Sequence, residues 1–153
     1  MLQASELRDR YLAGFNAHDL DTLLPTFSPR GVTITPEGQA EGREQLAYFL
    51  TELWTTFPDL HATVWESIDH TDTTVDEYQL VGTHRGPYPL PDGRIIPATG
   101  RPIRVRGCFL CSMEDGFIVS LRVYFDQLEL LAQLGWFPFP SPGEGINAEE
   151  AGD

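Results

Sequence analysis

The sequence predicts one α+β domain, in which helices cover one face of a strongly curved antiparallel sheet. Helical periodicity is confined to the segment before residue 58, and strand-like alternation fills most of residues 60–125. A chain of 153 residues is long enough to bury one core, and 41% hydrophobic content excludes a disordered chain. We therefore expect a single domain over residues 1–136.

Three helices are predicted, over residues 5–19, 19–27 and 42–57. The first begins at Ser5, which is a suitable N-cap, and its apolar residues form a stripe with four-residue spacing: Leu7, Tyr11 and Phe15. The second begins at Asp19. The third repeats apolar residues with helical spacing until Pro58 ends it.

Five strands are predicted, over residues 32–36, 60–68, 74–84, 101–113 and 117–125. The pair Asp115-Gly116 joins the last two, and this dipeptide is a strong signal for a type I′ hairpin turn. If that hairpin has no bulge, Asp126 faces Val105 and Tyr124 faces Gly107. Gly107 would then leave an open space beside Asp126.

The two ends of the chain carry no predicted element. Residues 137–153 are first aromatic and Pro-rich and then acidic, and we expect the end of this tail to be disordered. The N-terminus lacks the apolar stretch of a secretory signal, and no apolar run is long enough to span a bilayer. A cytoplasmic location is expected.

The charge of the chain restricts its partners and its chemistry. The formal net charge is −13, from 23 acidic and 10 basic residues, and every basic residue is Arg. So negative a protein is not expected to bind nucleic acid or an anionic membrane surface. The absence of Lys excludes any Schiff base formed by a side chain.

The sequence predicts neither a metal site nor a cofactor. Cys108 and Cys111 form a C-x-x-C pair, but their flanks are strand-like, so the two thiols point to opposite faces. A zinc site would need further ligands, and no spacing of the four His residues suggests a metal. We expect two buried thiols in a reducing compartment.

Asp126 is the first candidate catalytic residue. It lies between a predicted strand and a predicted helix, with apolar neighbours on both sides. Desolvation there would raise its pKa toward the range useful for proton transfer. It could equally be the N-cap of the helix that starts at Gln127, and the two roles are compatible.

His84 is the second candidate, because it ends a strand and precedes a loop rich in Pro and Gly. At a pocket mouth, a neutral imidazole could donate a hydrogen bond to a substrate carbonyl; the alternative is a hydrogen-bonded histidine at a strand end. Face parity and aromatic character favour six further residues as pocket lining: Tyr11, Phe15, Trp54, His61, Trp65 and Tyr124.

Several segments, in this order, resemble the SnoaL-like polyketide cyclases of the nuclear-transport-factor-2-like superfamily. They are "FNAHDLDTLLPTFSPRGV", "GREQLAYFLTELWTTFPDL", "GTHRG", "PATGRPIRVRG" and "MEDGFIVSLRVYFDQLELLAQLG", and the resemblance runs from about residue 5 to 136. It implies a cone-shaped fold around an apolar pocket, with dimers formed through the outer sheet face. It also implies that Asp126 is the acid/base of an intramolecular aldol closure.

These observations predict a cofactor-free cyclase or isomerase that acts on a hydrophobic, polyketide-like carbonyl substrate. One alternative is an epoxide hydrolase of the same fold, which would need an Asp-Arg-Asp set; Arg122 and Asp126 could supply two members. The other alternative is a non-catalytic protein that binds small molecules. We also expect a homodimer packed through the sheet, because the strand face with Val119, Leu121 and Val123 is too apolar for water.

Overall fold

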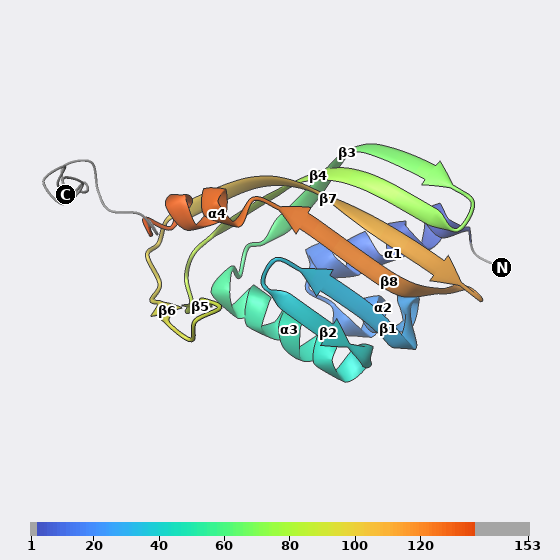
Figure 1. Ribbon diagram of the computed structural model, residues 1–153, viewed down its shortest axis with the longest axis horizontal. Coiled ribbons are helices and arrows are strands. Elements are labelled where there is room, and N and C mark those ends of the chain that lie inside the picture. Colours follow the sequence, from blue (N-terminus) through green and yellow to red (C-terminus); the bar gives the residue numbers. More distant parts are fainter. Residues whose placement is uncertain (1–2, 137–153) are drawn as a thin grey trace, which may run out of the picture.

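The computed structural model describes residues 3–136 (Figure 1). The helices are α1 (Ala4–Ala17), α2 (Leu20–Leu23), a 3-10 turn η1 (Leu24–Thr26), α3 (Gly42–Thr56) and α4 (Gln127–Gln133). The strands are β1 (Phe27–Thr35), β2 (Gly38–Glu41), β3 (His61–His70), β4 (Thr73–Thr83), β5 (Tyr88–Pro89), β6 (Ile95–Ile96), β7 (Pro102–Glu114) and β8 (Phe117–Phe125). The predicted disorder at the end of 137–153 lies outside the described residues.

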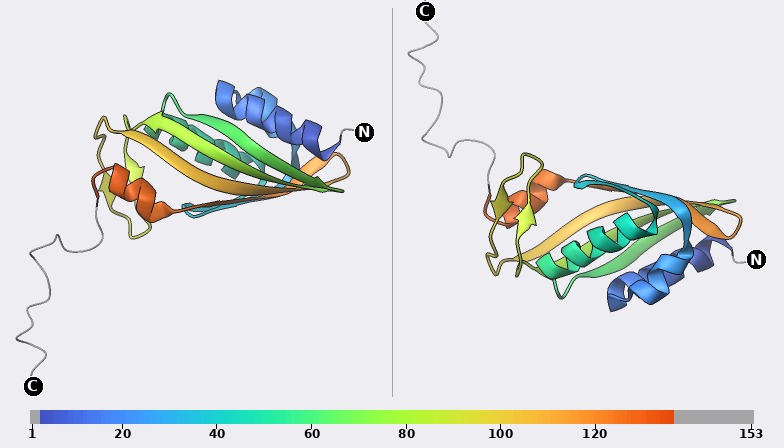
Figure 2. Two further views of the ribbon diagram at one scale, coloured as in Figure 1. Left: turned by 90° about the horizontal axis from the view of Figure 1, so that it is seen from above. Right: turned by 90° about the horizontal axis from the view of Figure 1, so that it is seen from below.

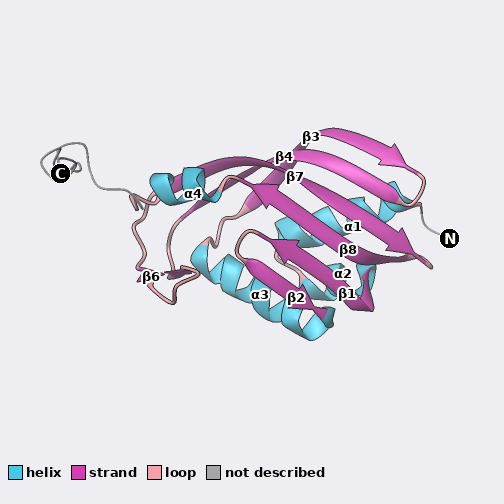
Figure 3. Cartoon of the chain, in the orientation of Figure 1, coloured by secondary structure: helices cyan, strands magenta, loops and turns pink. Residues whose placement is uncertain are grey.

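Six strands form one curved sheet in the order β2-β1-β8-β7-β4-β3, and β5 and β6 form a separate two-stranded ribbon (Figure 3). All neighbouring pairs of the large sheet are antiparallel except β1 and β8, which run parallel. The predicted α+β class, with three helices before the long strands and a curved sheet, is confirmed. The sheet is open and not closed into a barrel.

The helices α1, α2 and α3 lie on one face of the sheet, while α4 and the β5–β6 ribbon lie beyond one end of it (Figures 1 and 2). Helix α1 contacts β3, β4 and β7, and α3 contacts β1 and β2. The core therefore sits between these helices and the concave face of the sheet. Its first layer is the predicted stripe of α1, because Leu7, Tyr11 and Phe15 are all buried.

The helix starts follow ordinary capping chemistry. Asp19 caps α2 by accepting hydrogen bonds from the backbone N–H groups of Asp21 and Thr22. The N-cap of helix α1 lies two residues earlier than predicted, at Gln3 instead of Ser5. The side chain of Glu6 accepts a bond from the Gln3 backbone N–H, at 2.8 Å, in a capping box.

The β7–β8 hairpin has the predicted turn but not the predicted register. Asp115 and Gly116 both have positive φ, 51° and 79°, as a type I′ turn requires. A bulge between Ser112 and Met113 then shifts the pairing by one residue, so that Phe125, not Tyr124, faces Gly107. Side chains alternate along a strand, and one extra residue therefore exchanges the two faces of β8 beyond the bulge.

Because of this exchange, the residues predicted to form the dimer surface do not lie together on the outer face of the sheet. Leu121 is buried in the core and Val123 lines a pocket on the helix-covered face, so neither lies on the outer face of the sheet. Val119 is the extra residue of the bulge, since Ile118 pairs with Met113 and Ser120 pairs with Ser112.

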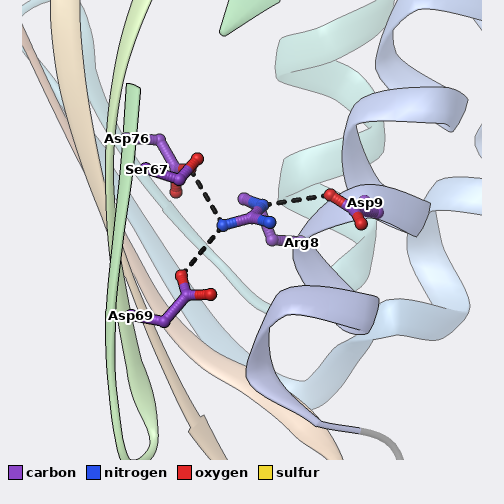
Figure 4. Close-up of polar contacts among 5 residues, drawn as sticks. All are labelled: Arg8, Asp9, Ser67, Asp69 and Asp76. Carbon is purple, nitrogen blue, oxygen red and sulfur yellow. Dashed lines mark hydrogen bonds and ion pairs between the residues drawn. The ribbon is translucent and has the colours of Figure 1, made fainter. Parts of the chain in front are cut away.

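A buried ionic cluster fastens α1 to the sheet near the N-terminus (Figure 4). Nη1 of Arg8 lies 3.0 Å from carboxylate oxygens of both Asp76 on β4 and Asp69 on β3, and its Nε lies 3.1 Å from Asp9. Burial opposes the charge on Arg8, but these carboxylates, with Asp76 first, outweigh that effect and raise its pKa. Ser67 donates a further hydrogen bond to Asp76, whose side chain is fully buried.

Within residues 3–136, no helix combines the length and the apolar character needed to cross a membrane.

Candidate functional site

Two adjoining cavities lie between α3 and the concave face of the sheet. The inner pocket has a free volume of about 80 Å³ and almost wholly apolar walls, which come from α1, α3 and strands β1, β3, β4, β7 and β8. The outer pocket, of about 850 Å³, lies between α3, β2 and the loop that carries β5. The two share three lining residues: Glu37, Phe49 and Leu53.

Glu37 supplies the only carboxyl group among the described residues that line the inner pocket. It lies in the tight turn between β1 and β2, and that turn is held by Thr35. The Thr35 hydroxyl accepts a hydrogen bond from the Glu37 backbone N–H, at 3.1 Å, and donates to the Gly38 carbonyl, at 3.3 Å. The turn thus fixes the backbone from which this side chain reaches the cavity.

Glu37 is half-buried, and the environment of its carboxyl group favours the neutral form. Burial raises the pKa of Glu37 to about 7, although a hydrogen bond with the Tyr88 hydroxyl works in the opposite direction. Burial also raises the pKa of Tyr88, and the nearby carboxylate of Glu37 adds to that rise. A carboxyl group with a pKa near neutrality can both accept and return a proton under ordinary conditions.

Tyr88 lies in the loop between β4 and β7, far from Glu37 in the sequence, and several contacts hold it in place. Its side chain is 1% exposed, and its hydroxyl accepts a long hydrogen bond, 3.5 Å, from Nε2 of Gln127 on α4. The residues just before it are bound to the end of α3. Thr56 donates to the Pro87 carbonyl at 2.7 Å, and its own carbonyl accepts from the Gly86 N–H at 3.2 Å.

Gly86 also packs directly on the backbone of α3. A Cβ atom at this position would lie 2.5 Å from the carbonyl oxygen of Thr55, a distance that real Cβ atoms do not adopt. The close approach of this loop to α3 therefore requires glycine at position 86.

The structure places Asp126 on the outside of the molecule. It is exposed, and its carboxylate accepts hydrogen bonds from the backbone N–H groups of Leu128 and Glu129, at 3.0 and 3.3 Å, as the N-cap of α4. The expectation that this carboxylate is desolvated is wrong, because the bulge in β8 turns Phe125 inward and Asp126 outward. A catalytic role for Asp126 stays a prediction.

His84 is fully buried and lines neither pocket, so its predicted position at a pocket mouth is wrong. Its Nδ1 accepts a hydrogen bond from the Thr99 backbone N–H at 3.2 Å and lies 2.8 Å from the Thr99 hydroxyl. Burial lowers the pKa of His84, which keeps the ring neutral. This geometry is that of the alternative, a hydrogen-bonded histidine at a strand end. The contacts between His84 and Thr99 join the two ends of the loop that carries Tyr88.

Two of the six predicted lining residues line the inner pocket, and four do not. Tyr11 and Phe15 line the inner pocket, and Trp54 packs behind it, edge-on to Phe15 and stacked on His18. The other three are exposed and line neither pocket: His61, Trp65 and Tyr124. Tyr124 faces outward because of the same shift in register that moves Asp126. Substrate contact by any of the six stays a prediction.

Glu37 was absent from the sequence-based candidates. The segment Thr33-Ile34-Thr35-Pro36-Glu37 reads as a short strand followed by a surface turn, and nothing local indicates burial. A usable signal was present, because Thr33, Thr35 and Glu37 alternate, and all three line the inner pocket.

The cysteines and the ionic cluster around Arg8 lie apart from the two pockets. In the described part of the chain, no three or more His, Cys, Asp or Glu side chains are grouped so as to hold a metal ion. Cys108 and Cys111 are free, and burial raises the pKa of Cys111 to about 12. The Asp76–Arg8–Asp69 arrangement resembles the set that the epoxide hydrolase alternative needs, but Arg8 and Asp76 line neither pocket.

Comparisons with known proteins agree with this architecture. The family model described as SnoaL-like polyketide cyclase matches residues 5–134. A solved structure assigned as a SnoaL-like polyketide cyclase, from Jannaschia sp. CCS1, is 24% identical with a TM-score of 0.78, and the match covers 89% of this chain and 94% of that chain. IdmH from Streptomyces antibioticus, assigned as a polyketide cyclase, is 28% identical with a TM-score of 0.72, covering 88% and 99%.

TsrD from Streptomyces laurentii is 26% identical, with a TM-score of 0.74 and coverage of 87% and 95%. No curated protein matches. Since the family model spans most of the sequence, the chain belongs to the SnoaL-like polyketide cyclase family.

Proposed function

We propose that this protein is a cofactor-free enzyme of the cyclase or isomerase type, which moves a proton on a hydrophobic, polyketide-like carbonyl substrate. The observation that carries the proposal is the inner pocket, whose apolar walls hold few polar groups, as small-molecule sites do. Membership of the cyclase family supports the reaction type.

The shape of the two cavities suggests how such a substrate lies. A pocket of about 80 Å³ admits only the end of a larger molecule, whereas the adjoining outer pocket offers about 850 Å³. In this arrangement the reacting carbonyl end enters the inner pocket, and the rest of the substrate occupies the outer pocket.

The experiment uses 2-tetralone, a small apolar ketone with an acidic carbon next to its carbonyl. Exchange of that carbon's protons for deuterium in D₂O is followed by proton NMR, with and without the full chain. We expect saturable exchange that is faster than in buffer alone. The controls are Ala62→Phe and Val123→Phe, which fill the inner pocket from two different strands, and each should abolish the acceleration while melting shows that it folds.

The outcomes separate the possible functions. Binding of 2-tetralone by the wild-type chain with exchange no faster than in buffer would support the non-catalytic binding protein instead. No binding, or equal exchange in the wild type and both folded pocket-filling variants, would contradict the proposed site. The epoxide hydrolase alternative gains no support, because neither Arg122 nor Asp126 lines the pockets.

A further inference from the structure

We propose that Glu37, and not Asp126, is the acid/base of this reaction, and that Tyr88 is the positioning residue that holds the Glu37 carboxylate. The assignment rests on the proposed function and deepens it. It concerns a residue in the β1–β2 turn and a residue in the β4–β7 loop, which the fold brings together at the boundary of the two pockets.

The first argument is position. Glu37 lines both cavities, so its carboxyl group can reach a substrate carbon in the apolar inner pocket and exchange its proton through the wider outer one. Asp126 lines neither pocket, and one of its oxygens is already engaged by two backbone N–H groups of α4.

The second argument is support from the surrounding structure. A proton-transfer group must be held in one geometry to act efficiently. The Thr35 hydroxyl fixes the turn below Glu37. Tyr88 lines the outer pocket together with Glu37, and its hydroxyl favours the Glu37 carboxylate. Tyr88 is in turn held by Gln127 and by the bonds between Thr56 and the loop.

The third argument is electrostatic. Burial in the apolar wall opposes ionisation of Glu37, and the hydrogen bond from Tyr88 favours it. These opposing effects leave the pKa of Glu37 at about 7, where the group is present in both forms at neutral pH.

The proposed step is balanced within the pocket. The Glu37 carboxylate takes a proton from the carbon next to the substrate carbonyl; the C–H electron pair forms the C=C bond of an enolate, and the charge moves to oxygen. The enolate carbon then forms a C–C bond to a second carbonyl carbon of the same molecule, whose oxygen becomes an alkoxide. Protonated Glu37 returns the proton to that alkoxide, so no oxidant or other reactant is consumed.

The enolate oxygen needs a hydrogen-bond donor, and Thr33 offers one. This residue is 4% exposed and lines the inner pocket, and its hydroxyl has no hydrogen-bond partner among the described residues. Thr33→Val keeps the shape of the side chain and removes only the hydroxyl. We expect this change to lower the exchange rate about 10-fold or more without weakening the binding of apolar compounds.

The test compares five chains in the 2-tetralone exchange assay: wild type, Glu37→Gln, Asp126→Asn, Tyr88→Phe and Glu66→Gln. Glu66 is exposed on β3 and lines neither pocket, so it is the matched control for loss of a carboxylate. We expect Glu37→Gln to lose at least about 100-fold in rate. Asp126→Asn and Glu66→Gln should stay within about 3-fold of the wild type.

The pH profile separates a positioning role for Tyr88 from a merely structural one. The wild-type rate should rise with pH and level off above about 7, as Glu37 ionises. Because the Tyr88 hydroxyl favours the carboxylate, Tyr88→Phe should move this midpoint to higher pH, whereas a structural defect would lower the rate at every pH alike.

Three results would overturn the assignment. If Asp126→Asn abolishes exchange and Glu37→Gln keeps it, the proposed function stands and Asp126 is the acid/base. If both variants keep it, neither residue is. If the wild type shows no exchange, the affinity for 2-naphthol is measured as a function of pH. Glu37 is not part of the site if the wild-type affinity does not change with a midpoint near pH 7. The same conclusion follows if Glu37→Gln shows the same midpoint as the wild type.

Discussion

Glu37 and Asp126 carry the same functional group in opposite surroundings. Glu37 is placed in an apolar wall, where burial penalises the charged form. Asp126 is exposed, and its carboxylate accepts hydrogen bonds from two backbone N–H groups at the start of α4. The chemistry of a carboxyl group is thus set by its location more than by its identity.

The raised pKa of Glu37 predicts how stability depends on pH. A pKa of about 7, above the usual 4.5, means that ionisation costs more in the folded chain than in the unfolded chain. The wild type should therefore lose stability as pH rises from about 4.5 to about 7. Glu37→Gln avoids this loss, and it should be the more stable chain at pH 8 by at most about 3 kcal/mol, with little difference at pH 4.

Denaturant unfolding of both chains at pH 4, 6 and 8 measures this difference. The profile of Glu44→Gln, which changes a carboxylate of the outer pocket alone, serves as the reference. A gap between Glu37→Gln and wild type that is constant across the three pH values would contradict a raised pKa for Glu37.

Asp126 should behave as a helix cap in stability measurements. Asn caps as well as Asp, so Asp126→Asn should change the free energy of unfolding by less than about 0.5 kcal/mol, whereas Asp126→Ala should cost about 1 kcal/mol. Urea unfolding of the two variants at pH 7 checks the difference. Equal losses in both would show that the charge matters beyond capping.

At the scale of elements, the helices and long strands followed from local pattern, because periodicity and turn residues are short-range signals. The bulge at Val119 did not, since the alternation of residues 117–125 fits either register equally well. The presence of Glu37 and Tyr88 on the wall of one pocket could not be predicted either, because it depends on how a long loop packs on α3. Candidate residues on β8 and the site carboxylate therefore needed the tertiary structure.

The cluster around Arg8 offers a test of how α1 is attached to the sheet. Removing one partner of a buried ion pair leaves the other charge without compensation. Arg8→Met leaves the buried Asp76 without its partner, and it should lower the free energy of unfolding by about 3–5 kcal/mol. Asp9→Asn removes a partner of the same arginine whose side chain is 67% exposed, and should cost less than about 1 kcal/mol. Thermal and urea unfolding at pH 7 compare the two.

If Arg8→Met and Asp9→Asn lose similar stability, the buried contact with Asp76 contributes no more than an exposed one. The attachment of α1 would then depend on its apolar stripe alone.

At the scale of the whole molecule, we propose a homodimer packed through the outer sheet face. Pairing places Ile34, Arg122, Leu110, Val75 and Ile68 in one row across five strands of this face. Ile34 and Ile68, at its two ends, are 42% and 62% exposed. Four of these five side chains are apolar, and so many in one row are unusual on a surface that faces only water.

Sedimentation at micromolar concentration should therefore show twice the 17.1 kDa of one chain. Ile34→Glu and Ile68→Glu should each shift the protein toward monomer, because a buried interface does not accept an unpaired charge. Tyr48→Glu is the matched control, since Tyr48 is 71% exposed on α3 and lies away from the sheet face. A wild-type monomer, or a dimer that Tyr48→Glu alone disrupts, would exclude this interface.

The extra residue in β8 has a consequence for how such a protein can change over time. Loss or gain of one codon near Val119 would exchange every side chain that the end of β8 presents to the pocket with those it presents to the outside. Phe125 and Asp126 would exchange faces in a single mutational event, whereas point substitutions would need a separate change at each position. One insertion or deletion in β8 therefore connects two arrangements of the site in evolution. In one, the pocket carboxylate lies in the β1–β2 turn, and in the other it lies at the start of α4.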